Sequence, residues 1–155
     1  MINIKNFFLF GAVIVFLSII FYSSTRPSQS RSVIKEYIYA VEIGGQTVTV
    51  ALASTPEQQA QGLSGRSSLK ADEGMLFIFD TPGIHPFWMK DMKIPLDIIW
   101  LSEDGKIVYI KKDARPELFP ESYAPSENAK YVLEVVSGFS EENNLKAGDR
   151  VEFRY

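Results

Sequence analysis

The stretch EYIYAVEIGGQTVTVALA, residues 36–53, decides the class of fold. On both sides of Gly44-Gly45, successive side chains fall into two alternating sets. This period of two is typical of β-strands, in which neighbouring side chains point to opposite faces. Two consecutive glycines suit the positive φ values of a two-residue hairpin turn. We therefore predict a β-hairpin at the start of a β-rich domain.

More strand signals follow this hairpin along the chain. Residues 96–111, LDIIWLSEDGKIVYIK, predict a second hairpin that turns at Asp104-Gly105. Single strands are predicted at residues 75–80, 131–138 and 150–155. Residues 113–130 contain three prolines and predict a long connection without regular structure, which we expect to pack down as the wall of a cleft.

The helix signals are short. In STPEQQAQG, residues 54–62, Thr55 and Gln58 form a capping box, Pro56 suits the first helical position and Gly62 can end the helix. A second short polar helix is predicted near residues 140–146. About seven strands with one or two short helices favour a mainly β fold, a single β-sandwich or partly closed barrel, over a βαβ fold.

An apolar segment precedes this domain. Residues 7–22 are apolar and lie inside an uncharged window, residues 6–25, that as a helix spans about 30 Å, the thickness of a bilayer's hydrocarbon core. A transmembrane anchor is the favoured interpretation. A cleaved signal peptide is the alternative, although no A-x-A-like site follows.

We accordingly expect three parts: an anchor or signal segment at 1–25, a flexible Ser-rich tether at 26–35 and a β-rich domain at 36–155. Positive charges flank the apolar segment on both sides, and those after it favour a cytoplasmic domain. The short, positive, acid-free amino terminus instead resembles an export signal. We expect a single-pass protein of the cell membrane with an extracytoplasmic carboxy-terminal domain.

The composition excludes several classes of chemistry. The chain has no cysteine, one histidine and a formal charge of −3, so a thiolate nucleophile, a disulfide and a Cys-based metal site are impossible. Charges of both signs are interspersed, so no nucleic-acid partner is expected. A soft-metal site at His85, Met89 and Met92 is a weak alternative, and we expect neither a metal nor another cofactor.

The stretch HPFWMKDMKIPLDIIW, residues 85–100, carries the densest mixture of functional side chains. Prolines at both ends of its first part favour an extended or looped path that leads into a strand. Asp97 in that strand and Glu134 in YVLEVV lie among apolar neighbours. Each buried carboxylate needs a cation, several N–H donors or a raised pKa. Structural ion pairing and a functional site are both consistent with this pattern.

Three segments together resemble one family: GLSGRSSL (62–69), GMLFIFD (74–80) and FWMKDMKIPLDIIWLSEDGKI (87–107). The chain is similar to domain of unknown function (DUF) family 192, also called the UPF0127 family, over about residues 41–153. The resemblance implies a compact β-rich domain that is often exported or membrane-tethered, and it brings no established activity. Ser64 replaces the family's usual Met, and Asp91-Met92 replaces its Asn-Thr, which would change a ligand site there.

These observations lead to one main hypothesis, a domain that binds a small molecule or an envelope component in a polar and aromatic cleft lined by Arg66, Trp88, Lys90 and Asp97. One alternative is an envelope hydrolase in which Asp97 or Glu134 is the general acid or base. In one form of this hypothesis the two residues act together as a carboxylate pair. The other alternative is a purely structural or assembly module.

Overall fold

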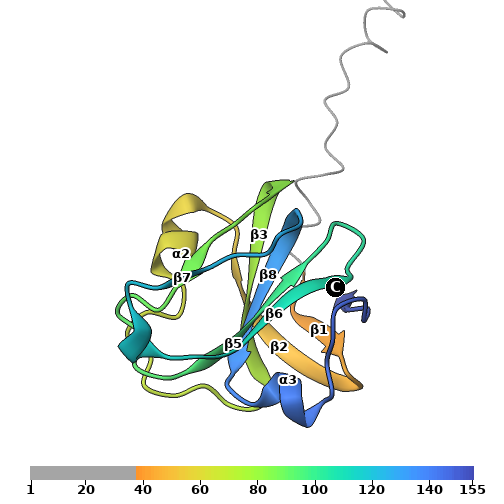
Figure 1. Cartoon of the computed structure of the whole chain (residues 1–155). Coiled ribbons are helices and arrows are strands. Elements are labelled where there is room, and N and C mark those ends of the chain that lie inside the picture. The colour runs from red at the N-terminus through yellow and green to blue at the C-terminus, as the bar shows by residue number, and fades with distance from the viewer. Residues whose placement is uncertain (1–37) are drawn as a thin grey trace, which may run out of the picture. The chain divides into compact units, whose positions relative to one another are not determined.

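The structure is a computed structural model that describes residues 38–155. In this part of the chain the protein forms a mainly β domain (Figure 1). Seven strands make one strongly curled sheet, a half-barrel, with the order β6-β5-β8-β3-β2-β1-β9, and two more strands make a small second sheet. The predicted mainly β class with short helices is confirmed. The large sheet corresponds to the predicted partly closed barrel. The predicted alternative, a β-sandwich of two packed sheets, does not form.

The elements have the following bounds. The large sheet contains β1 (Ala40–Ile43), β2 (Gln46–Ala53), β3 (Glu73–Gly83), β5 (Leu96–Leu101), β6 (Ile107–Ala114), β8 (Ala129–Val136) and β9 (Glu152–Arg154). The small sheet pairs β4 (Phe87–Trp88) with β7 (Ser122–Tyr123). The helices are α2 (Pro56–Gln61), the 3-10 turn η2 (Pro116–Leu118) and α3 (Phe139–Glu142).

The local predictions from sequence are confirmed where short-range chemistry decides them. β1 and β2 pair antiparallel across Gly44-Gly45, whose φ values are 58° and 77°. β5 and β6 form the second hairpin. At the start of α2, Thr55 Oγ1 accepts a hydrogen bond from Gln58 N at 3.3 Å, and Gln58 Oε1 accepts one from Thr55 N at 3.1 Å. This is the predicted capping box.

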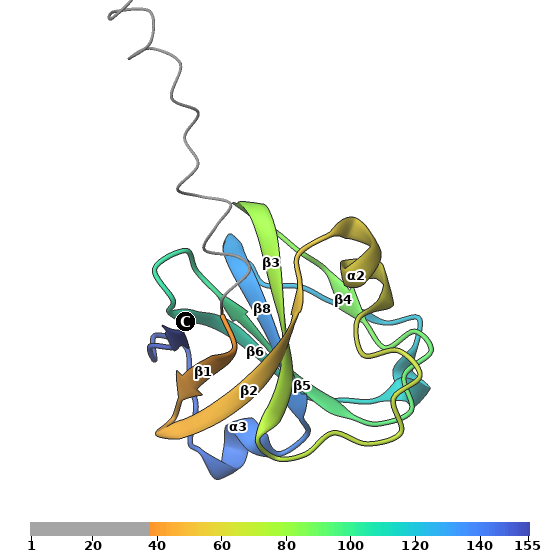
Figure 2. The same ribbon diagram turned by 180° about the vertical axis from the view of Figure 1, so that it is seen from behind.

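One pairing departs from the antiparallel pattern. β2 and β3 run parallel, and the chain connects them through α2, so the sheet contains a single βαβ-like crossover that the sequence analysis did not predict. Two parallel strands require such a crossover, because the chain must return to the end of the sheet where the first strand began. A tight turn can join only antiparallel strands. The crossover brings α2 close to β4 of the small sheet (Figure 2).

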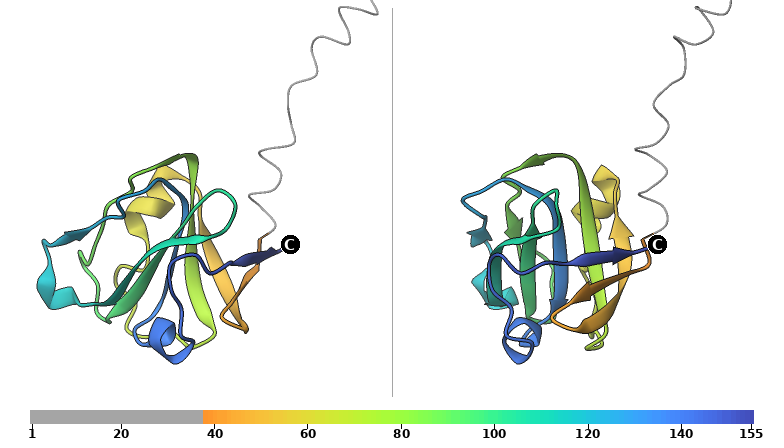
Figure 3. Two further views of the ribbon diagram at one scale, coloured as in Figure 1. Left: turned by 45° about the vertical axis from the view of Figure 1, so that its right-hand side comes forward. Right: turned by 90° about the vertical axis from the view of Figure 1, so that its right-hand side faces the viewer.

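The large sheet buries side chains on both faces. Along β5 and β8, Ile99 and Leu133 enter one apolar cluster, whereas Ile98 and Val132 enter a second cluster on the opposite face. Every residue of β5 is buried, which explains its nearly continuous apolar sequence. The two α-helices lie toward opposite ends of the strands, α2 at one end and α3 at the other (Figure 3).

The two edges of the half-barrel meet at one point. An isolated antiparallel bridge joins Lys106 to Arg150, next to the first residues of β6 and β9. Backbone hydrogen bonds extend the contact, from Ile107 N to Asp149 O at 2.9 Å and from Val151 N to Gly105 O at 2.8 Å. The sheet is therefore partly closed, as one of the two predicted architectures requires.

The proline-rich connection of residues 113–130 contains more regular structure than predicted. It includes η2 and the two-residue strand β7, in which Tyr123 is buried and pairs with Phe87 of β4. Pro116 is the first residue of η2, a position that tolerates proline, and no proline occurs inside β7, so no ladder hydrogen bond of that strand is removed. The connection packs down beside β4, as expected, but none of its residues lines the cleft of about 650 Å³ described below, so it does not form the predicted wall of that cleft.

Within residues 38–155 no helix has the length and apolar character needed to cross a bilayer. The predicted anchor or signal segment at 1–25 and the predicted tether at 26–35 lie outside the described residues.

Candidate functional site

A cleft of about 650 Å³ lies between the loop that follows α2 and the turn that follows β4. This volume is in the range of small-molecule sites, roughly 300–1,000 Å³. The lining residues come from α2 and its loop, from β3, from the β4 segment and from β8: Gln59, Ala60, Gln61, Gly62, Leu63, Ser64, Gly65, Phe77, Phe79, Pro86, Phe87, Trp88, Lys90, Asp91, Met92 and Glu134.

Two hydrogen bonds join the opposite walls of the cleft. Ser64 Oγ donates to Lys90 O at 3.2 Å, and Gly65 N donates to Asp91 O at 3.0 Å. Gly65 and Asp91 both have positive φ values, 81° and 56°, which lets each segment turn at the contact. The sequence motifs GLSGR and FWMKD therefore form one rim, although 26 positions separate Ser64 from Lys90.

Aromatic side chains form much of the cleft surface. The ring of Phe87 packs edge-on against Phe77, with centroids 4.8 Å apart, and against Trp100, with centroids 5.7 Å apart. Trp100 is fully buried and donates a hydrogen bond from Nε1 to His85 O at 2.8 Å. Trp88 differs from these rings because 57% of its surface is exposed at the rim. Its indole can therefore contact a bound molecule.

Glu134 supplies a buried acid to the cleft. Its neighbours in the strand register are Met75 on β3 and Ile98 on β5, both apolar, and only 5% of its surface is exposed. Within residues 38–155 its Oε2 atom has no hydrogen-bond partner. Burial raises the pKa of the Glu134 carboxyl to about 8, because the charged form loses its hydration. At neutral pH the side chain is therefore mostly a carboxylic acid.

Gly74 allows β3 to approach β8 closely beside this acid. A Cβ atom at residue 74 would lie 2.7 Å from Glu134 O and 3.2 Å from Val48 Cγ1. Only a residue without a side chain fits at this position. This gives the glycine of the GMLF motif a structural role next to the cleft.

Asp97 has a different environment on the other face of the sheet. Its Oδ1 accepts a hydrogen bond from Asp113 N at 2.9 Å and a longer one from Gly138 N at 3.4 Å, and its Oδ2 accepts one from Ser140 N at 2.8 Å. Backbone donors thus stabilise this fully buried carboxylate, in place of the lysine or arginine that ion pairing would supply. Asp97 fixes the end of β6 and the start of α3.

The structure brings together two of the four residues predicted to bind a ligand. Trp88 and Lys90 line the cleft, whereas Asp97 borders a separate cavity of about 290 Å³ near α3. Arg66 is exposed and does not line either of these two spaces. The hydrogen bond with Lys70 lowers the pKa of Glu73, and the charge of Arg66 lowers it further to a smaller degree.

The predicted pairing of Asp97 with Glu134 in a hydrolase does not form. In the β5–β8 register Asp97 lies opposite Val135 and Glu134 lies opposite Ile98. Because successive side chains of a strand point to opposite faces, the two carboxylates are separated by the sheet. Glu134 is the cleft residue that the predicted binding set omitted, and its only signal in the sequence was a charge within the apolar run YVLEVV.

The residues considered for a soft-metal site have packing roles. His85 stacks on Phe79 with ring centroids 3.6 Å apart, and Met89 and Met92 pack into the apolar cluster on the cleft side of the sheet. Within the described residues there is no group of three or more His, Cys, Asp or Glu side chains that could hold a metal ion.

Comparison with solved structures identifies similar domains. A protein of unknown function from Novosphingobium aromaticivorans is 33% identical, with a TM-score of 0.70 over 74% of this chain and 84% of that one. A Sinorhizobium meliloti protein proposed to be a transcription regulator is 34% identical, with a TM-score of 0.68 over 74% of this chain and 89% of that one. Comparison with curated proteins gives no match. The model of the DUF192 family, described as "Uncharacterized ACR", matches residues 39–153, and the chain therefore belongs to this family.

Proposed function

We propose that the domain binds a small organic molecule in the cleft between the α2 loop and the β4 turn. The observation that carries the proposal is the buried Glu134 carboxyl group, whose Oε2 atom has no partner within residues 38–155 and which lines a cleft of about 650 Å³. A buried polar atom without a partner destabilises a fold, so its retention next to a cleft points to a ligand that supplies the partner.

The rest of the lining supports this function. The cleft combines the rings of three phenylalanines and Trp88 with a comparable share of polar surface. In small-molecule sites, aromatic side chains supply contact area and polar groups fix the orientation of the ligand. Trp88 offers an exposed ring and Lys90 an exposed cation at the rim, and no salt bridge involving Lys90 occurs among the described residues. A module with only a structural role would cover these two side chains.

We further propose that residues 1–25 hold this domain at the cell membrane and that the domain lies outside the cytoplasm. The support is the uncharged window of residues 6–25, long enough as a helix to cross a hydrocarbon core of about 30 Å. A ligand of the cleft would then come from the cell envelope or from outside the cell.

A thermal-shift screen of the purified full-length chain against small aromatic, amine and sugar compounds tests the binding function. A ligand that binds only the folded state raises the melting temperature in a concentration-dependent way. Trp88→Ala and Lys90→Ala should each weaken binding of a compound found in this way, with little change in the melting temperature of the free protein.

Matched controls come from exposed residues outside the cleft. Tyr155→Ala removes an exposed aromatic ring and Lys112→Ala an exposed lysine, and neither residue lines the cleft. Both variants should bind as the unmodified chain does. The proposal fails if no compound binds, or if the cleft variants and the control variants bind equally well.

A further inference from the structure

We infer that the cleft selects an organic ammonium ion, a molecule with a protonated primary or secondary amine on an apolar body, and that this amine pairs with Glu134 Oε2. The inference rests on the proposed function and adds the chemical class of the ligand.

The unpaired oxygen defines what the ligand must provide. Within residues 38–155 no side chain or backbone group donates to Glu134 Oε2, and no salt bridge includes Glu134. An ammonium group supplies hydrogen-bond donors and a positive charge at the same atom. A charge-assisted hydrogen bond is stronger than one from a neutral hydroxyl or amide, so the acid favours an amine over these groups.

The aromatic lining favours the same class of ligand. Phe79, Phe87 and Trp88 line the cleft that contains Glu134. Aromatic rings attract cations through their quadrupole and bind apolar groups through their surface. A molecule with an amine at one end and an apolar body at the other satisfies both the acid and the rings.

Among the described residues, no cationic side chain forms a salt bridge with Glu134, so a ligand can supply its counter-ion. The neighbours from β3 and β5, Met75 and Ile98, are uncharged, and the polar α2 residues that line the cleft are glutamines. Lys90 and Asp91 are the titratable groups of the rim, both exposed and of opposite sign. A cation is therefore not repelled by a net positive rim, whereas an anion would meet the buried acid.

Binding of an ammonium ion would displace a proton from Glu134. Without a ligand, burial raises the pKa of the carboxyl to about 8, so at neutral pH the reaction is the exchange of the carboxyl proton for the ammonium ion. The proton leaves to solvent and the carboxylate remains paired with the ligand. The apparent affinity should then rise about tenfold per pH unit up to about pH 8 and level off above it.

Isothermal titration of the full-length chain with benzylammonium chloride and with benzyl alcohol tests this inference. These probes share an aromatic body and differ in the charged group. Between about pH 6.5 and about pH 8.5 the affinity for benzylammonium should rise about 20-fold as the fraction of ionised Glu134 increases. At the lower pH, titrations in buffers of different ionisation enthalpy should show release of about one proton per ligand bound.

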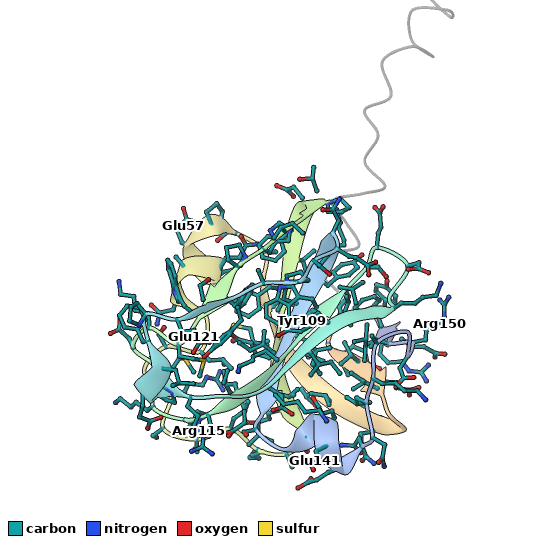
Figure 4. All side chains as sticks on the ribbon, viewed as in Figure 1. Glu57, Tyr109, Arg115, Glu121, Glu141 and Arg150 are labelled. Carbon is teal, nitrogen blue, oxygen red and sulfur yellow. The ribbon has the colours of Figure 1, made fainter. Side chains whose placement is uncertain are left out.

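Two variants separate the role of Glu134 from a general charge effect. Glu134→Gln should abolish both the pH dependence and the preference for benzylammonium over benzyl alcohol. Glu141→Gln removes an exposed carboxylate in α3, far from the α2 end of the strands (Figure 4), and should leave both unchanged.

The outcomes distinguish this inference from the proposed function. Equal or tighter binding of benzyl alcohol, or an affinity for benzylammonium that falls as pH rises, would overturn the ammonium class and leave a ligand-binding cleft. Failure of both probes to bind at millimolar concentration would also overturn it, and the compound screen would then decide the proposed function separately.

Discussion

Asp97 and Glu134 come from neighbouring strands, but their carboxyl groups lie on opposite faces of the curled sheet. Asp97 accepts hydrogen bonds from three backbone N–H groups, whereas Glu134 retains an oxygen without a partner in the described part of the chain. The same sequence anomaly, an acid in an apolar strand, therefore has a structural explanation in one case and indicates a site in the other.

Glu134 should make the stability of the domain depend on pH. Its pKa is raised from an ordinary value of 4.5 to about 8 on folding, so the folded state holds a proton that the unfolded state releases. The contribution of this group is complete below about pH 4.5 and is lost as the pH rises to about 8, with a slope of about 1.4 kcal/mol per pH unit. Urea denaturation across this range measures the slope, and Glu134→Gln should remove it. An identical pH profile for the two proteins would contradict the prediction.

Asp97→Ala should destabilise the domain strongly. The substitution leaves the partly buried N–H group of Asp113 and the buried N–H group of Ser140 without an acceptor, and an unsatisfied buried donor costs about 1–3 kcal/mol. We expect a loss of about 3 kcal/mol or more in the free energy of unfolding. Asp97→Asn keeps one acceptor oxygen and should be milder. A loss below about 1 kcal/mol for the alanine variant would show that water replaces the carboxylate.

Gly74→Ala should also destabilise the domain, because the new Cβ atom would lie 2.7 Å from Glu134 O and β3 would have to move away from β8. We expect a cost of about 1–3 kcal/mol, as for other overpacked positions. Gly83→Ala is the matched control in the same strand, where the nearest atom to a new Cβ is in the His85 ring at 3.4 Å. Thermal or urea denaturation should separate the two variants, and equal stability would contradict the prediction.

The two tryptophans of the chain should report on different regions. Trp100 is fully buried and Trp88 is mostly exposed, so Trp88→Phe should leave emission that is blue-shifted and poorly quenched by acrylamide. Trp100→Phe should leave red-shifted, easily quenched emission that changes when a ligand enters the cleft. A ligand that binds without changing the Trp88 signal would contradict contact with this indole.

Residues 1–25 should determine membrane association. Cell fractionation should find the full-length chain with the membranes and a variant lacking these residues in the soluble fraction. Protease added to spheroplasts should digest the domain if it lies outside the cytoplasm. A shortened soluble product from the full-length chain would instead identify a cleaved signal peptide.

Features that depend on nearby residues could be predicted from the sequence. The Gly44-Gly45 hairpin and the capping box at Thr55 follow from turn and helix-end chemistry, and both form as predicted. The parallel pairing of β2 with β3 and the β4–β7 sheet join distant segments, and no local pattern specifies such partners. The site shares this limit: Trp88 and Lys90 stand out in one motif, but only the strand register separates Asp97 from Glu134.

The hydrogen bonds from Ser64 to Lys90 and from Gly65 to Asp91 have a consequence for the kinetics of binding. They tether the two walls of the cleft to each other, so the walls do not have to be ordered separately when a molecule arrives. A preorganised site loses little conformational entropy on binding, and its association rate is not limited by loop closure. Differences in affinity among ligands of this cleft should therefore appear mainly as differences in how long each one stays.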